Sequence, residues 1–77
     1  MPTVYTKDNC HLCSLTKRAL RQRGIPFVEV NVDEDFGARE MLVAKGFKQM
    51  PVVDPGREGL AWWSGFRLDL IKGLMGV

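Results

Sequence analysis

Two cysteines separated by two residues are the side chains of this sequence best suited to chemistry. Cys10 and Cys13 enclose His11 and Leu12, and they are the two cysteines of the chain. A disulfide between them would close a very short loop and would stabilise the fold little, because the entropic benefit comes from joining distant segments. Reversible thiol chemistry or metal binding explains such a pair better.

A single chain has too few candidate side chains to form a metal site. A structural zinc site needs four ligands, usually supplied as two pairs. The sequence offers Cys10, Cys13 and its single histidine, His11. We therefore expect no metal site within one chain. Two inert buried thiols, or a non-enzymatic module in which two chains pool their cysteines around zinc or an iron–sulfur cluster, stay open as alternatives.

The elements predicted around the pair favour a reactive Cys10. Residues 3–6 alternate as a strand, and apolar residues at helical spacing predict a helix from His11 to about Arg23. Cys10 then lies at a helix start, where free N–H groups and the helix dipole stabilise a thiolate, the attacking species. Cys13, one turn later, can attack a mixed disulfide formed at Cys10. The spacing thus predicts a nucleophile and a resolving cysteine.

The rest of the chain predicts a βαβαββα order in one domain over residues 1–77. The pattern favours a second strand over residues 27–32 and then a helix that is opened by the acids at 33–35 and runs to about Lys45. A third strand over 51–53 is followed by a turn at 54–56 and a fourth strand over 60–63. After a break at Ser64 and Gly65, a last helix is predicted from about Arg67 to Leu74. The first strand–helix–strand unit is parallel and the last two strands form a hairpin, so we expect a small mixed α/β sheet flanked by helices.

Other residues near the predicted site have a functional and a structural interpretation. Before the third strand, a cis peptide bond at Met50-Pro51 would leave the Met50 backbone free to pair with a substrate, whereas a strand can also simply begin at a proline. His11 could favour the Cys10 thiolate as an imidazolium, but we expect it to face solvent on the contact rim without an ionisation role.

Two further groups are placed by periodicity. Trp62 and Trp63 should face opposite sides of their strand, with one in the core and the other available to a partner. The cations Lys17, Arg18 and Arg21 are interpreted as a solvated helix face.

Composition excludes other classes of function. The 77 residues have room for one domain, 45% hydrophobic content supplies a core, and 26% charged content is ordinary for a soluble protein. A net charge of +2 is too small for a surface that neutralises several phosphates. The start lacks a leader pattern and no stretch approaches about 18 apolar residues. We expect a cytoplasmic protein without nucleic-acid or membrane partners.

Nearly the whole chain resembles an NrdH-redoxin, a glutaredoxin-like protein of the thioredoxin superfamily. The matching stretches are Tyr5-Thr6, the Cys10 and Cys13 pair followed by Thr16-Lys17-Arg18, Asn31-Val32-Asp33, residues 46–53 and, most specifically, Trp63-Ser64-Gly65-Phe66-Arg67. The resemblance implies a thioredoxin-like, glutaredoxin-type three-layer fold with a four-stranded mixed sheet and a cis Pro51. It also implies a monomeric dithiol-disulfide oxidoreductase that carries electrons from thioredoxin reductase to the large subunit of class Ib ribonucleotide reductase, with no cofactor beyond its redox-active cysteines.

The partner-binding residues expected from this resemblance surround the cysteines. They are Lys7, His11, Leu12, Met50, Pro51, Trp63, Ser64, Gly65, Phe66 and Arg67. Glutaredoxins that use glutathione usually carry Thr-Val-Pro and a later Gly-Gly-x-Asp-Asp, where this chain has Gln49-Met50-Pro51 and the residues 63–67. Lys7, placed as in glutaredoxins, keeps a glutathione-dependent glutaredoxin as the alternative. The chain departs from the resembled family at His11-Leu12, where Gln commonly precedes the second cysteine, and at Leu68, where Pro is common.

Overall fold

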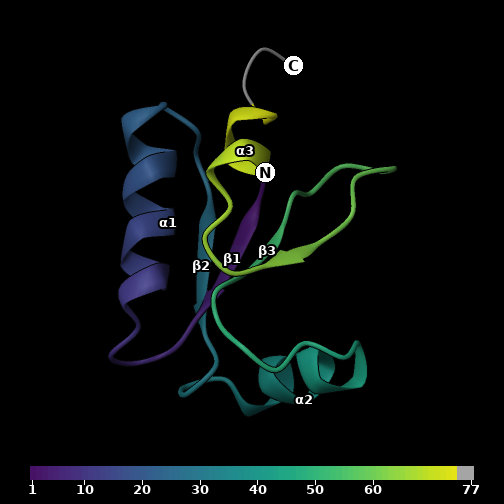
Figure 1. The fold of residues 1–77 in the computed structure, drawn as a ribbon. Coiled ribbons are helices and arrows are strands. Elements are labelled where there is room, and N and C mark those ends of the chain that lie inside the picture. Colours follow the sequence, from purple (N-terminus) through teal and green to yellow (C-terminus); the bar gives the residue numbers. More distant parts are fainter. Residues whose placement is uncertain (75–77) are drawn as a thin grey trace.

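The computed structural model describes residues 1–74 and confirms the predicted βαβαββα order (Figure 1). The elements are β1 (Thr3–Thr6), α1 (His11–Gln22), β2 (Val28–Asn31), α2 (Phe36–Ala44), β3 (Val52–Asp54), β4 (Trp63–Ser64) and α3 (Leu68–Lys72). Most boundaries fall within three residues of those predicted from hydrophobic spacing.

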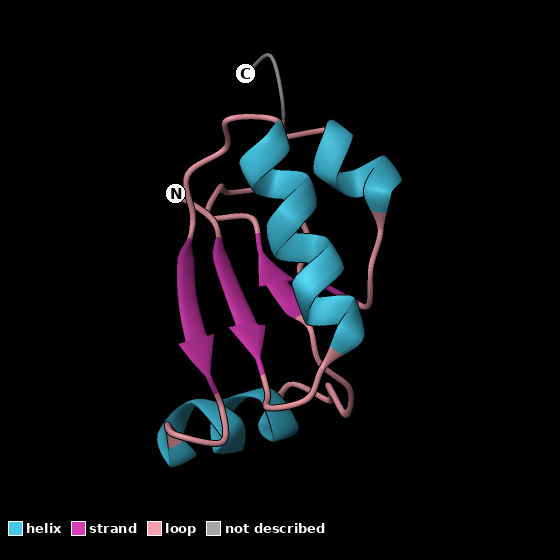
Figure 2. Ribbon diagram, turned by 90° about the vertical axis from the view of Figure 1, so that its left-hand side faces the viewer, coloured by secondary structure: helices cyan, strands magenta, loops and turns pink. Residues whose placement is uncertain are grey.

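The strands form one mixed sheet in the order β2-β1-β3-β4. β1 and β2 are parallel, with Thr6 opposite Asn31, while β3 is antiparallel to both β1 and β4. The strands β1 and β2 therefore end at the same edge, and Figure 2 shows the first turn of α1 and all of α2 near that edge. The chain segments that follow these two strands meet there.

Two apolar clusters cover the two faces of the sheet and make the three layers. Val53 belongs to the cluster formed with α1 and α3, which includes the fully buried Leu20 and Ile71. Its neighbour Val52 belongs to the cluster formed with α2 through Leu42. Adjacent residues of a strand point to opposite faces, so β3 places one valine in each layer. The three-layer, thioredoxin-like architecture is thus confirmed.

The fourth strand differs from its prediction. β4 covers Trp63 and Ser64, so the expected strand over residues 60–62 and the expected break at Ser64 are wrong. Trp62 stacks between Tyr5 and Phe47, with ring centroids 5.9 and 6.4 Å away, rather than pairing in the sheet. Residues 55–62 consequently form a longer loop, which begins with the predicted turn at residues 54–56, where the N–H of Gly56 donates to Asp54 Oδ1 at 2.8 Å. Within residues 1–74, none of the helices is long and apolar enough to span a membrane.

Candidate active site

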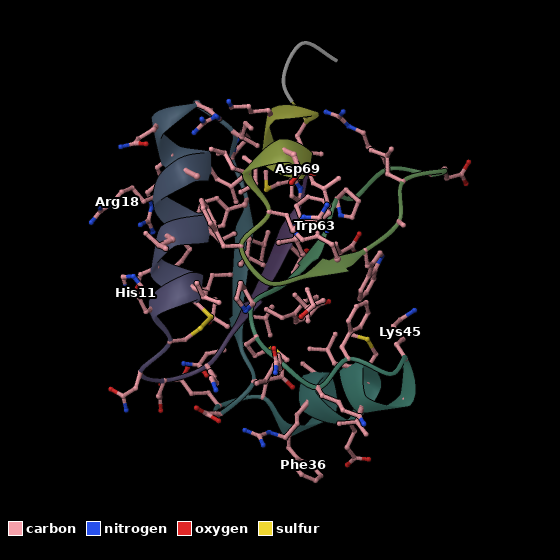
Figure 3. All side chains as sticks on the ribbon, viewed as in Figure 1. His11, Arg18, Phe36, Lys45, Trp63 and Asp69 are labelled. Atoms are coloured by element: carbon pink, nitrogen blue, oxygen red, sulfur yellow. A yellow bond between two sulfur atoms is a disulfide. The ribbon has the colours of Figure 1, made fainter. Side chains whose placement is uncertain are left out.

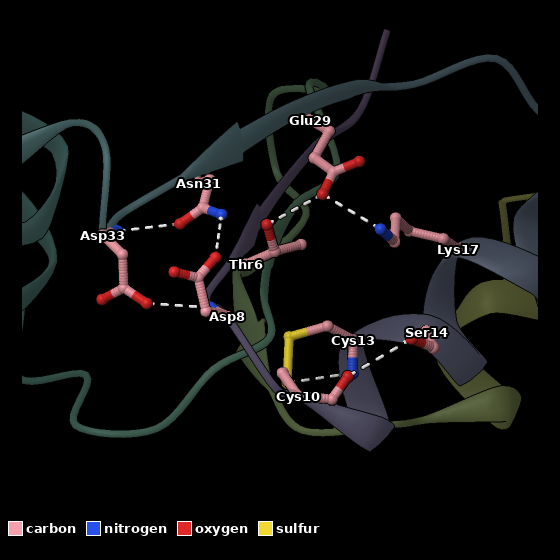
Figure 4. Close-up of polar contacts among 9 residues, drawn as sticks. All are labelled: Thr6, Asp8, Cys10, Cys13, Ser14, Lys17, Glu29, Asn31 and Asp33. Carbon is pink, nitrogen blue, oxygen red and sulfur yellow. Dashed lines mark hydrogen bonds and ion pairs between the residues drawn. A yellow bond between two sulfur atoms is a disulfide. The ribbon is translucent and has the colours of Figure 1, made fainter.

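Cys10 is the N-cap of α1, and its sulfur accepts the first hydrogen bond of the helix. The backbone N–H of Cys13 donates to Cys10 Sγ at 3.1 Å (Figure 4). The two sulfurs form a disulfide, with the Cα atoms 5.2 Å apart. Cys13 is 2% exposed, whereas Cys10 is half-buried. Cys10 is thus the more exposed of the two cysteines, and the roles of nucleophile for Cys10 and resolving residue for Cys13 remain a prediction.

The loop before β3 lies against the accessible sulfur. The carbonyl oxygen of Met50 is 3.8 Å from Cys10 Sγ. In the disulfide this is a contact only, because the sulfur carries no hydrogen; a Cys10 thiol would have one to donate. The Met50-Pro51 peptide bond is cis, as the resemblance implied, and Pro51 is buried while Met50 is half-buried.

Ser64 of β4 and Gly65, the residue after it, hold this loop in place through two hydrogen bonds. Ser64 Oγ donates to the carbonyl of Gln49 at 2.9 Å, and the N–H of Gly65 donates to the carbonyl of Pro51 at 2.8 Å. The bonds lie on both sides of Met50. Ser64 and Gly65, predicted from the resemblance as partner contacts, thus have a clear role in supporting the loop that faces Cys10.

A polar network that sequence reasoning missed holds the segment before Cys10. Asn31 Nδ2 donates to Asp8 Oδ1 at 2.9 Å, and the N–H of Asp8 donates to Asp33 Oδ2 at 2.8 Å (Figure 4). Asn31 Oδ1 also accepts the N–H of Asp33 at 2.8 Å, and Arg39 of α2 pairs with the Asp33 carboxylate. The stretch Asn31-Val32-Asp33 was noted for its resemblance, but its contact with Asp8 depends on the parallel pairing of β1 and β2.

A surface pocket of about 470 Å³ opens beside the loop before β3, which contains Met50. Met50, Phe47 and Leu42 contribute apolar lining, and the basic side chains around it are Lys7, Arg39 and Lys48. Lys7, predicted as a contact residue, is exposed here. An apolar pocket with cations at its rim suits a ligand that carries both apolar groups and carboxylates.

The remaining predicted contact residues fall into an exposed and a buried group. His11 is exposed on the outer side of α1, and Leu12 is 44% exposed (Figure 3). Trp63 is 8% exposed and packs in the core with α1 and α3, where its indole N–H lacks a hydrogen-bond partner among the described residues. Phe66 is half-buried against the same core. The surface next to Cys10 is thus formed by the exposed group.

Arg67 is paired within its own helix start, and the two tryptophans lie in different apolar clusters. Arg67 forms a two-pronged ion pair with Asp69, at 2.9 and 3.1 Å, in which hydrogen bonding raises the pKa of Arg67 and lowers that of Asp69. Trp62 and Trp63 lie on opposite faces as predicted, since they join different apolar clusters. The expected exposed tryptophan is wrong: Trp62 is half-buried, and the Lys45 ammonium lies 4.6 Å from its ring centroid.

The described site can support a two-electron exchange between a dithiol and a disulfide. One sulfur is accessible and receives an N–H bond that would stabilise its thiolate, and the other is buried next to it. The neighbouring backbone and pocket can hold a substrate against the accessible sulfur.

Known proteins share both the sequence and the fold around this site. The glutaredoxin family model matches residues 3–65. The glutaredoxin-like protein NrdH of Salmonella typhimurium is 49% identical over 72 residues, covering 94% of this chain and 85% of the relative. The Escherichia coli NrdH protein is 47% identical with the same coverage. A solved structure of Escherichia coli NrdH-redoxin superposes with a TM-score of 0.89 and 45% identity, covering 99% of this chain and 96% of that one.

Proposed function

Since the chain belongs to the glutaredoxin family, and within it to the NrdH thiol-disulfide oxidoreductases, we propose that it is an electron donor to a protein disulfide. The proposed substrate is the large subunit of class Ib ribonucleotide reductase, and the proposed reductant is thioredoxin reductase. The protein acts as a monomer in the cytoplasm, and its cysteine pair is the redox group. The structure of the Escherichia coli relative, described as that of a protein with a thioredoxin-like activity profile, supports this choice of reductant.

The segment of residues 63–67 supports thioredoxin reductase over glutathione as the reductant. It occupies the position at which glutaredoxins that use glutathione usually carry a Gly-Gly-x-Asp-Asp motif, which this segment resembles only in its place in the chain. Here Trp63 is buried, and the donors of Ser64 and Gly65 bond to the loop of Gln49 and Pro51. Because these donors are engaged within the protein, they are not offered to the backbone of a glutathione molecule.

The reaction moves two electrons and two protons to the substrate. The Cys10 thiolate attacks one sulfur of the substrate disulfide, so that a mixed disulfide forms and the other substrate sulfur leaves as a thiolate and takes up a proton. Cys13 then loses its proton and attacks Cys10 Sγ, which breaks the mixed disulfide and releases the second substrate sulfur as a thiol. The substrate leaves as a dithiol, and the Cys10–Cys13 disulfide remains for its reductase.

The backbone around the site supports the attacking residue in this sequence. The Cys13 N–H that donates to Cys10 Sγ stabilises negative charge there, as does the start of α1. Met50 presents its backbone next to the same sulfur, where an extended substrate segment can pair with it.

Glutathione is a second candidate reductant, favoured by the pocket beside Met50. The cations Lys7 and Lys48 around this pocket suit the carboxylates of a small peptide thiol, whereas Arg39 is already paired with Asp33. The two candidate reductants can be distinguished in one assay, because electrons reach the protein from NADPH either through thioredoxin reductase or through glutathione reductase and glutathione.

A coupled assay that follows NADPH oxidation tests the proposal. The oxidised protein is supplied with either thioredoxin reductase, or glutathione and glutathione reductase, with ribonucleotide reductase as the disulfide substrate. We expect turnover with thioredoxin reductase and none for the Cys10→Ser variant. Turnover with glutathione alone would replace the proposed reductant. A coloured protein that dimerises when iron is added would instead support the module with pooled cysteines.

A further inference from the structure

A partly exposed polar cluster, whose one buried member is Thr6, lies behind the disulfide and has no part in the function proposed above. Lys17 Nζ of α1 pairs with Glu29 Oε2 of β2 at 3.0 Å, and Thr6 Oγ1 of β1 donates to the same oxygen at 2.9 Å. Thr6 is 1% exposed, and the side chains of Lys17 and Glu29 are 22% and 36% exposed. Of the three cations expected on a solvated helix face, Arg18 and Arg21 are exposed and Lys17 is half-buried in its pair with Glu29.

The fold brings this cluster close to the cysteines. Lys17 follows Cys13 by four residues in α1, so the two side chains lie one turn apart on the same side of the helix. Thr6 ends β1, and the chain reaches Cys10 four residues later. In Figure 4, Thr6 lies between the Glu29 carboxylate and the disulfide. Cys13 and Thr6 are 2% and 1% exposed, so water is excluded on the cysteine side of the cluster, whereas its outer side, at Lys17 and Glu29, is partly exposed and partly screened.

The charges of the cluster are matched. Burial alone would raise the pKa of Glu29, but hydrogen bonds from Lys17 and Thr6, together with the charges of Lys17 and Arg21, hold it below its usual value. Glu29 is consequently an anion at neutral pH that balances the Lys17 ammonium. Arg21, one turn further along α1, lies with its guanidinium 5.5 Å from the centroid of the Phe27 ring.

We propose that Glu29 is a positioning residue for the redox reaction, which pairs with the Lys17 ammonium and thereby keeps that positive charge from stabilising the cysteine thiolate. Reduction of the disulfide creates negative charge on sulfur, so an unmatched cation nearby favours the reduced form. The pair then sets how oxidising the Cys10–Cys13 disulfide is. This inference rests on the dithiol chemistry proposed above and not on the identity of the partners.

Substitutions that remove one charge at a time test the inference, with a redox titration against a thiol buffer. In Glu29→Gln the side-chain oxygen still accepts the Thr6 bond while Lys17 becomes unmatched. We expect the equilibrium constant to move about threefold to tenfold towards the reduced protein, and the thiol pKa from alkylation rates to fall. Lys17→Met leaves Glu29 unmatched and should move both quantities in the opposite direction. The double variant should return close to the unaltered protein, and Lys17→Arg should preserve its values.

Arg18→Met is the matched control, because it removes an exposed cation from the same helix without touching the pair. It should leave the equilibrium constant unchanged. Shifts of the same sign in Glu29→Gln and Lys17→Met, or no shift in either, would overturn the inference and indicate a structural role. If instead the opposite shifts occur in a protein that fails to reduce ribonucleotide reductase, the inference holds and the proposed substrate is wrong.

Discussion

At the scale of single residues, the two cysteines differ in exposure and in hydrogen bonding. Cys10 Sγ accepts the N–H of Cys13 and is half-buried, whereas Cys13 is 2% exposed. A large substrate disulfide can approach only the first of these sulfurs. The second reacts with a sulfur that is already bonded to Cys10 and needs no access to solvent.

This asymmetry predicts which variant traps a substrate. Cys13→Ser keeps the accessible nucleophile but removes the residue that resolves the mixed disulfide, so a covalent complex with the substrate should accumulate. Cys10→Ser leaves a buried thiol and should trap little. Non-reducing electrophoresis of each variant after incubation with an oxidised protein substrate measures the complex. Trapping by Cys10→Ser alone would reverse the assignment.

Substitution of His11 tests whether the residue next to Cys10 changes the reduction potential of the Cys10–Cys13 disulfide. It is exposed at the first position of α1, where the helix dipole disfavours a cation while the adjacent thiolate favours one. An exposed interaction at a helix end contributes about 0.3–1 kcal/mol, and about 1.4 kcal/mol corresponds to about 30 mV for a two-electron couple. His11→Val should therefore change the potential by less than about 30 mV and leave disulfide reduction intact. A several-fold larger change in a redox titration would make His11 a tuning residue.

At the scale of elements, the sequence predicts well those features that depend on neighbouring residues in the chain. The strand that ends before Cys10 and the helix that starts after it are each marked by their own spacing, so the position of Cys10 at the N-cap follows. The bond from Ser64 to Gln49 could not be predicted in this way, because it forms only when β4 pairs with β3. Trp62 likewise stacks between side chains from distant elements, and this packing outweighs its preference for a strand.

Ser64 provides the test at this scale. Ser64→Ala removes the hydroxyl that holds the carbonyl of Gln49, next to Met50. A hydrogen bond of this kind contributes about 0.5–1.5 kcal/mol, so the loop should be less well ordered against a bound substrate. We expect KM for the protein substrate to rise about threefold to tenfold with kcat nearly unchanged. The exposed Ser14 of α1 is the comparison variant, since its hydroxyl makes a longer bond of 3.4 Å, to the carbonyl of Cys10, and none to the loop before β3. Equal effects of Ser64→Ala and Ser14→Ala on KM would contradict the supporting role.

At the scale of the whole molecule, both ends of the sheet are fixed by contacts between distant segments. One end carries the cysteines, the loop before β3 and the network of Asp8 with Asn31. At the other end, the carbonyl of Pro2 accepts the N–H of Val28 at 2.9 Å, which extends the pairing of β1 with β2. The loop after β3 lies against Met1. The stability of the sheet can thus be perturbed far from the chemistry.

Gly56 and Gly59 allow this to be tested with a matched pair of substitutions. Both have positive φ, +73° and +84°, so alanine at either position incurs a backbone strain of about 1 kcal/mol. At Gly56, however, a Cβ would lie 2.5 Å from the carbonyl oxygen of Met1, whereas at Gly59 it would meet no atom within 4 Å. The obstructing atoms are backbone, and they belong to the residue before Pro2, whose carbonyl accepts the bond from β2.

We therefore expect Gly56→Ala to lower the free energy of unfolding by about 2–4 kcal/mol, the strain plus the cost of overpacking, and Gly59→Ala by about 1 kcal/mol. Urea unfolding of the two oxidised variants measures the difference. The Gly56→Ala protein that remains folded should keep the redox equilibrium of the unaltered chain, because the cysteines lie at the opposite end of β1. Equal losses of stability in the two variants would show that the contact of the loop with Met1 contributes nothing. A changed redox equilibrium would show instead that the two ends of the sheet are coupled.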